Sequence, residues 1–100
     1  MSNSIKELFT LLDKTDYRII AHTHRVWIQM GSAVVPTLVE LLTTGSYRQV
    51  ANTVMVLGEI GDLCSLPALI DLLFTHPNHH VRHDINVALQ RLSYSQAVEG

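Results

Sequence analysis

A pattern of three leucines occurs three times in this chain, at intervals of about 30 residues: Leu8, Leu11 and Leu12; Leu38, Leu41 and Leu42; Leu69, Leu72 and Leu73. Pro36 recurs in the same way as Pro67, and Gly31 recurs as Gly61. A fixed period of this length is typical of stacked supersecondary units, each of which buries its apolar face only against its neighbours. The repeat therefore predicts an array of similar units rather than one globular core.

The apolar residues within each unit recur at helical rather than strand spacing, as Ile5, Leu8 and Leu12 do. Glycines and capping residues divide the chain into six expected helices, at about 4–13, 17–30, 33–43, 47–60, 63–74 and 79–92. The polar tail, residues 93–100, is expected to fray. We therefore expect an all-α solenoid over residues 1–92, made of half a repeat, two full repeats and a further half repeat.

Composition narrows the range of partners. The net charge is −2 with neutral histidines, whereas a nucleic-acid-binding domain usually carries a basic stripe. No apolar run approaches the length of about 18 residues that a membrane span needs. A single cysteine, Cys64, fits a reducing cytoplasm. We therefore expect a cytoplasmic protein that binds neither nucleic acid nor membrane, and that carries no cofactor.

Two segments resemble the HEAT-like repeat of the phycobilisome-lyase type: Leu57-Gly58-Glu59-Ile60-Gly61-Asp62, and Leu66-Pro67-Ala68-Leu69-Ile70-Asp71-Leu72-Leu73. The segment His76 to Arg82 is similar to the linker of that family, with two histidines in place of Asp and Pro. The resemblance is strongest over residues 57–92, and it implies an α-solenoid. The family includes bilin lyases, hydroxylases and adaptors. Its hydroxylases bind iron through His-Glu dipeptides, and this chain contains none.

Four of the six histidines cluster before and within the last expected helix: His76, His79, His80 and His83. His79 and His83 are four residues apart, which places two imidazoles on one helix face, where they can bind a metal ion. The alternative is a solvated first turn. We favour the alternative, because a metal site usually needs a third or fourth ligand.

Two further polar residues have a structural and a functional interpretation. Cys64 stands near an expected helix start, where the helix dipole lowers the pKa of a thiol. No base is close to it in sequence, so we expect a small buried residue rather than a reactive thiol. His24 falls on the buried face by the 30-residue period, and we expect it at the edge of the core, bonded to a carbonyl.

Arg18, Arg48 and Arg82 recur near the starts of the second, fourth and sixth expected helices. A cation at that position opposes the helix dipole, so an acidic partner is expected beside each arginine. The family resemblance implies that such arginines stack along the array and bridge neighbouring repeats. We therefore predict that the three form a structural ladder rather than a ligand site.

Polar residues recur beside each leucine pattern and line up across the repeats. In solenoids these helices line the concave surface that binds partners. We predict a partner-binding ridge there, and its residues are Glu7, Thr37, Glu40, Thr44, Asp71 and Thr75. The alternative is a solvated face without a binding role.

These observations favour a non-enzymatic protein–protein interaction module, a scaffold or adaptor, that binds another protein on the ridge or at an open end of the array. Two alternatives remain: an accessory subunit of a bilin-lyase-like system, and a metal-binding protein that uses the histidine cluster. The apolar flanks of the first and last helices also predict a homodimer through one end. We favour the C-terminal end, where Tyr94 and Val98 could give partial cover.

Overall fold

The computed structural model describes the backbone of residues 2–99 and the side chains of residues 5–93. This part of the chain is helical and contains no strand, which confirms the all-α prediction. The helices are α1 (Ser2–Leu11), α2 (Tyr17–Met30), α3 (Val35–Leu41), α4 (Tyr47–Ile60), α5 (Leu66–Thr75) and α6 (His79–Glu99). Two short 3-10 turns, η1 (Gly31–Val34) and η2 (Leu63–Ser65), lead into α3 and α5.

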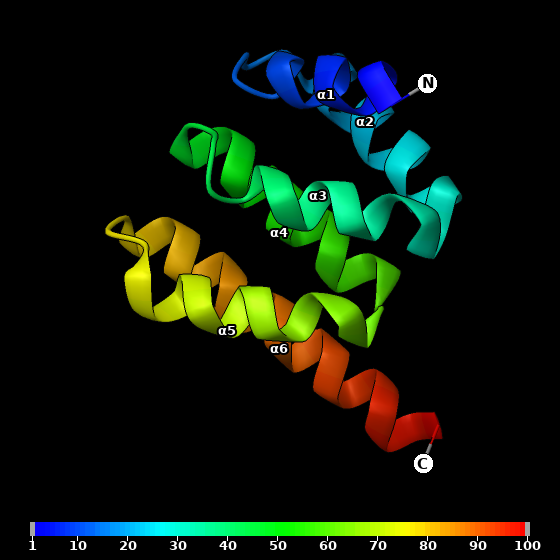
Figure 1. The fold of residues 1–100 in the computed structure, drawn as a ribbon, viewed down its shortest axis with the longest axis vertical. Helices are drawn as coiled ribbons and strands as arrows, with labels where there is room; N and C mark the ends of the chain where they lie inside the picture. Colours follow the sequence, from blue (N-terminus) through cyan, green and yellow to red (C-terminus); the bar gives the residue numbers. More distant parts are fainter. Residues whose placement is uncertain (1, 100) are drawn as a thin grey trace.

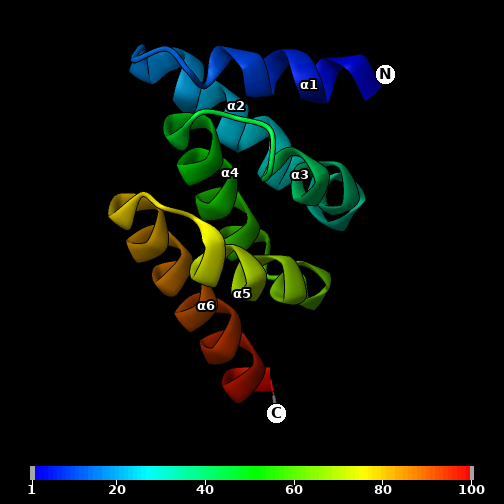
Figure 2. The same ribbon diagram turned by 60° about the vertical axis from the view of Figure 1, so that its left-hand side comes forward.

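The helices follow one another along the long axis of the molecule, from α1 at one end to α6 at the other (Figure 1). Helix α2 packs on α4 and α4 packs on α6, so these three form a row. Helices α3 and α5 pack on α4 and α6 respectively, and both lie on the same side of that row (Figure 2). Helix α1 packs on α2 and α4 at the N-terminal end.

Helices α2 and α4 begin and end at the residues expected from the sequence, because local capping fixes their ends. The carboxylate of Asp16 accepts a hydrogen bond from the backbone N–H of Arg18 at the start of α2. Ser46 and Gln49 form a reciprocal capping box at the start of α4. Gly31 and Gly61 end the two helices with φ angles of 61° and 75°, which favour glycine.

The other helices differ from the expected ranges. Helix α1 ends at Leu11, because the N–H groups of Leu12 and Lys14 donate to carbonyls three residues earlier and tighten the last turn. The segments before Pro36 and Pro67 form 3-10 turns instead of the first turns of α3 and α5. Helix α6 continues to Glu99, whereas we expected it to end near residue 92; residues 93–99 contain no proline or glycine to stop it.

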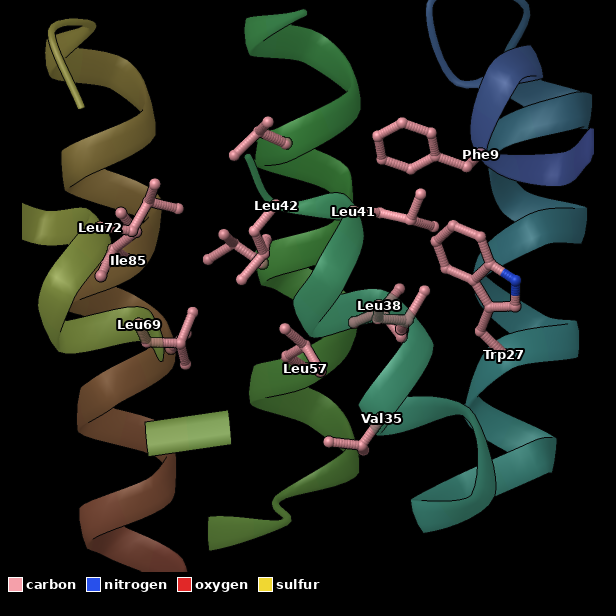
Figure 3. Close-up of a cluster of buried hydrophobic side chains, with 14 of the residues drawn as sticks. Phe9, Trp27, Val35, Leu38, Leu41, Leu42, Leu57, Leu69, Leu72 and Ile85 are labelled. Atoms are coloured by element: carbon pink, nitrogen blue, oxygen red, sulfur yellow. The ribbon is translucent and has the colours of Figure 1, made fainter. Parts of the chain in front are cut away.

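The leucine patterns supply the core. Leu12, Leu38 and Leu69, one from each pattern, are fully buried. The row contributes its own fully buried residues, which include Trp27, Leu57 and Ile85. Figure 3 shows Trp27, Leu38, Leu57, Leu69 and Ile85 among the buried side chains between the helices. The buried residues of all six helices therefore belong to one hydrophobic cluster.

Gly58 allows α4 and α6 to approach each other closely. A Cβ atom at this buried position would lie 2.9 Å from the Cβ of Ala88 and 3.0 Å from its Cα. Alanine favours a helix over glycine by about 1 kcal/mol, but overpacking a tight contact costs about 1–3 kcal/mol. We expect Gly58→Ala to reduce the free energy of unfolding by about 1 kcal/mol, measured by urea denaturation.

The matched test of this contact adds Ala88→Gly to the Gly58→Ala variant. Removing the Cβ of Ala88 should relieve the overlap, so the coupling between the two substitutions should be favourable despite the helix penalty of a second glycine. Strict additivity of the two losses would show that this contact does not set the spacing of α4 and α6.

Candidate functional site

A groove with a volume of about 300 Å³ crosses the surface of the α2–α4–α6 row. Its lining comes from the α1–α2 connection and from each helix of the row: Leu12, Lys14, Thr15, Tyr17, Ile20, Tyr47, Arg48, Ala51, Asn52, Met55, His80 and Asp84. A smaller hollow of about 80 Å³ shares Met55 and Asp84 with it and continues between α4 and α6 to Arg91. We call the two together the row groove.

Helical spacing explains why α4 contributes more of the lining than any other helix. Arg48, Asn52 and Met55 follow one another at intervals of four and three residues, so they share one face of the helix. Tyr17 and Tyr47 are the first residues of α2 and α4, one repeat apart. The repeat therefore places chemically similar side chains at successive positions along the groove.

Several large apolar side chains along the row groove are exposed to solvent. The exposed fraction is 85% for Tyr17, 47% for Tyr47, 48% for Met55 and 38% for Val87. Scattered exposed apolar residues are normal, but a group of them around one hollow is typical of an interaction surface. The sequence patterns predicted no role for these residues. The recurrence of Tyr-Arg at 17–18 and 47–48, 30 residues apart, is the signal that could have identified the two tyrosines.

Charged groups lie at different parts of the row groove. Lys14 and Arg48 are at the side of the α1–α2 connection, whereas Asp84 is on α6. The Nε atom of Arg48 donates to Oη of Tyr47 at 3.2 Å, and its guanidinium lies 5.8 Å from the centre of that ring. The hydrogen bond to Tyr47 raises the pKa of Arg48, so the cation is held in place on the tyrosine.

Asp84 is half-buried in the groove wall, and this burial raises its pKa. The neighbouring His83 and His80 oppose the shift when they carry charge. A carboxyl group whose pKa is raised in the folded state destabilises the folded protein when it is ionised. This destabilisation disappears as the pH falls through the raised pKa and the group takes up a proton. An ionisable group kept in a groove at such a cost is a candidate for a role in binding.

We expect Asp84→Asn to be slightly more stable than the wild type at pH 8. The expected gain in melting temperature is roughly 2–4 °C, which corresponds to about 0.5 kcal/mol for a chain of this size. The difference should shrink toward pH 5, because the raised pKa of Asp84 lets its carboxylate take up a proton before an ordinary aspartate does. Thermal denaturation at both pH values tests this. An equal loss of stability at both would mean that the carboxylate is a structural partner.

The histidine cluster does not converge on a metal site in the part of the chain whose side chains are described. Among residues 5–93 no group of three or more His, Cys, Asp or Glu side chains is placed to hold a metal ion. The rings of His79 and His80 lie against each other, with centroids 4.1 Å apart. Nδ1 of His76 accepts a hydrogen bond from the backbone of Asn78, while His79 and His83 are exposed. Of the four, His80 lines the row groove.

The three arginines predicted to form a ladder differ in their contacts. Nε of Arg18 lies 3.5 Å from the carboxylate of Asp16, and Nη1 of Arg82 donates to the carbonyl of His76 at 2.7 Å. Arg48 contacts Tyr47, its neighbour in sequence. His76 is the C-cap of α5, so the Arg82 contact joins the end of α5 to α6, and the charge of Asp13 at the end of α1 also acts on Arg48.

Other polar side chains do join neighbouring repeats. Nε2 of Gln49 donates to the carbonyl of Phe9 at 3.1 Å, and Oγ of Ser46 donates to the carboxylate of Asp13 at 2.6 Å. His24 is half-buried and lies 2.9 Å from Oδ1 of Asn52, so its carbonyl partner belongs to a side chain. These contacts tie α1 and α2 to α4.

The residues of the predicted ridge lie on or beside α1, α3 and α5. Glu7, Glu40 and Asp71 are exposed, as are Thr44 and Thr75, whereas Thr37 is half-buried. The hydroxyls of Thr44 and Thr75 donate to the carbonyls of Leu41 and Asp71 in their own helical segments. The row groove lies instead on the helices of the row, so the ridge contributes no residue to it.

Cys64 is exposed, which corrects the expectation that it is buried. It lies in η2, the 3-10 turn that precedes α5. The neighbouring carboxylate of Asp62 raises the pKa of the thiol, through a hydrogen bond and through its charge. The thiol is therefore held in its neutral, less reactive form.

Over the described part of the chain, no helix is long and apolar enough to cross a membrane. Comparison of the sequence with protein-family models and with curated proteins, and of the fold with solved structures, gives no match.

Proposed function

We propose that this chain is a HEAT-like α-solenoid that acts as a non-enzymatic protein-interaction module. Three features support the architecture: the 30-residue leucine repeat, the order of the helices along the long axis, and the row that α2, α4 and α6 form. A stack of this kind presents a long continuous surface, which is how repeat proteins bind their partners.

The observation that carries this proposal is the row groove with its exposed Tyr17, Tyr47 and Met55. Tyrosine, methionine and arginine are enriched in protein interfaces, where large side chains bury apolar area and retain a polar tip. The groove is open along its length and combines these side chains with charges. We therefore place the binding surface on the row groove rather than on the ridge of α1, α3 and α5.

Quantitative affinity purification with three versions of the chain tests this proposal. Met55→Glu places a charge in the groove, and Glu40→Lys changes the charge of the ridge; both positions are exposed, so both variants should fold. We expect at least one protein to be lost by more than tenfold with Met55→Glu and retained with Glu40→Lys. Loss with Glu40→Lys alone would move the binding surface to the ridge. If both variants retain every partner, the proposal that the row groove is the binding surface is wrong.

Self-association is a second candidate function, favoured by a separate hollow near the C-terminal end. This hollow has a volume of about 370 Å³ and is lined by Leu63, Leu66, Leu92 and Ser93. Leu63 is 43% exposed. The side chains of Tyr94 and Val98, which we expected to give partial cover, lie outside the described residues. Light scattering at tens of micromolar should show that the wild-type chain is a dimer and that Leu63→Glu disrupts this dimer. A monomeric wild type would contradict self-association.

A further inference from the structure

The basic residues of this chain are concentrated at one edge of the molecule. The connections that precede α2, α4 and α6 lie along the same edge, at the left of Figure 1. Four of the seven Lys and Arg residues lie in these connections or in the first turns of the row helices: Lys14, Arg18, Arg48 and Arg82. The net charge of the whole chain is −2, so this basic edge is a local feature.

The two acidic residues that precede α2 on this edge, Asp13 and Asp16, are engaged within the protein. The carboxylate of Asp13 accepts a hydrogen bond from Ser46 at 2.6 Å. Asp16 caps α2 and pairs with Arg18. Lys14 and Arg48 are exposed, and within residues 5–93 neither forms an ion pair with a carboxylate. Two exposed cations therefore lie at the mouth of the row groove, where an anionic group of a ligand can reach them, although the charge of Asp13 also acts on Arg48.

The row groove connects these cations to an apolar surface. Lys14 and Arg48 share its lining with Tyr17, Ile20 and Met55. Arg48 is already oriented by its hydrogen bond to Tyr47, so less side-chain entropy is lost when it pairs with a carboxylate. A single ligand can therefore contact a positive group and an apolar surface in the same hollow.

We propose that the row groove binds an extended segment of a partner protein in which acidic side chains stand next to a large apolar one. The acidic side chains pair with Lys14 and Arg48, and the apolar side chain packs on Tyr17 and Met55. Asp84 repels an acidic group on the α6 side, so it fixes the direction in which the segment lies. This inference rests on the proposed function, because it names the chemistry of the partner for the same groove.

Fluorescence anisotropy with defined peptides tests the chemistry. The probe is a labelled 12-residue peptide with Asp and Glu flanking a Phe-Leu pair. One matched peptide replaces every acid with Lys, and another replaces Phe-Leu with Ser-Ser. We expect the acidic, apolar probe to bind at least tenfold more tightly than either, and its affinity to fall as salt is added. Equal or tighter binding of the Lys peptide would overturn the inference.

Charge variants of the full chain test the position of the site. Arg48→Glu combined with Lys14→Glu should weaken binding of the acidic probe by at least tenfold. The control is the pair Arg25→Glu and Lys6→Glu, which makes the same change in net charge at exposed residues outside the groove lining. Circular dichroism checks that each variant folds. An equal effect of both pairs would mean that only net charge matters, and would overturn the assignment.

Two further measurements separate this inference from its alternatives. Asp84→Asn should keep or raise the affinity for the acidic probe, and a tenfold loss would contradict the proposed direction. A labelled single-stranded RNA that binds the groove more tightly than the peptide would replace the acidic protein segment as the ligand. If Met55→Glu loses cellular partners but the acidic probe does not bind, this inference fails and the proposed function stands; if Met55→Glu loses none, the row groove is not the binding surface, and the result with Glu40→Lys then decides whether the ridge is.

Discussion

Replacement of Trp27 with alanine should remove about 3–5 kcal/mol from the free energy of unfolding. Trp27 is fully buried in α2, and Figure 3 shows its indole ring on the side of the helix that faces Leu38 and Leu41 of α3. A large cavity in the N-terminal part of the stack would follow from this change. Since domains of this size are stable by about 5–15 kcal/mol, the variant should be close to unfolding at 37 °C.

Urea denaturation followed by circular dichroism measures this loss, and Trp27→Phe is the matched control. Phenylalanine keeps an aromatic ring and removes an indole N–H that makes no hydrogen bond to the described protein. We expect the Phe variant to lose less than half of what the Ala variant loses. A loss below about 1 kcal/mol for Trp27→Ala would mean that the indole of Trp27 is not buried in the core as described.

Leu69→Ala should be the second most damaging change, with an expected loss of about 2–5 kcal/mol. Leu69 is fully buried in α5, and in Figure 3 it lies with Leu72 beside Ile85 of α6. Its loss would open a cavity where α5 packs on α6. The measurement is again chemical denaturation, with the slope of the transition checked so that a change in the unfolded state is not mistaken for a change in stability.

Phe74→Ala is the control for Leu69→Ala on the same helix. Phe74 is 82% exposed although it is larger than Leu69, so truncating it should change stability by less than about 0.5 kcal/mol. Similar losses for the two variants would show that α5 is rotated about its axis relative to the described structure. The comparison therefore tests the face of the helix and not merely its presence.

The residues of the leucine patterns and the ends of α2 and α4 could be predicted because they depend on local chemistry. The helical period places Leu12, Leu38 and Leu69 on buried faces, and these three are fully buried. Caps such as Asp16 and Ser46 act within three residues of their own position. The length of α6 was predicted less well, because a polar composition alone does not stop a helix that meets no glycine or proline.

The position of the candidate site could not be predicted, because it depends on how distant segments pack. Lys14 and Asp84 are 70 positions apart in the chain, yet both line the same groove. Their proximity requires α2, α4 and α6 to pack in one row, and that spacing depends on contacts such as the one between Gly58 and Ala88. From the sequence we expected the binding residues on the ridge, where polar positions recur. No sequence pattern assigned a binding role to Tyr17 or Met55, which are exposed.

By itself, the sequence determined that the chain forms repeated helices with one apolar face each, because helix propensity, capping and apolar period are properties of short segments. Only the tertiary structure decided which remaining side chains meet at a surface. Exposure of Met55, the cation of Arg48 held on Tyr47, and the partial burial of Asp84 all result from the angle and distance between neighbouring helices. Those quantities are set by packing between residues far apart in the chain, which no local pattern encodes.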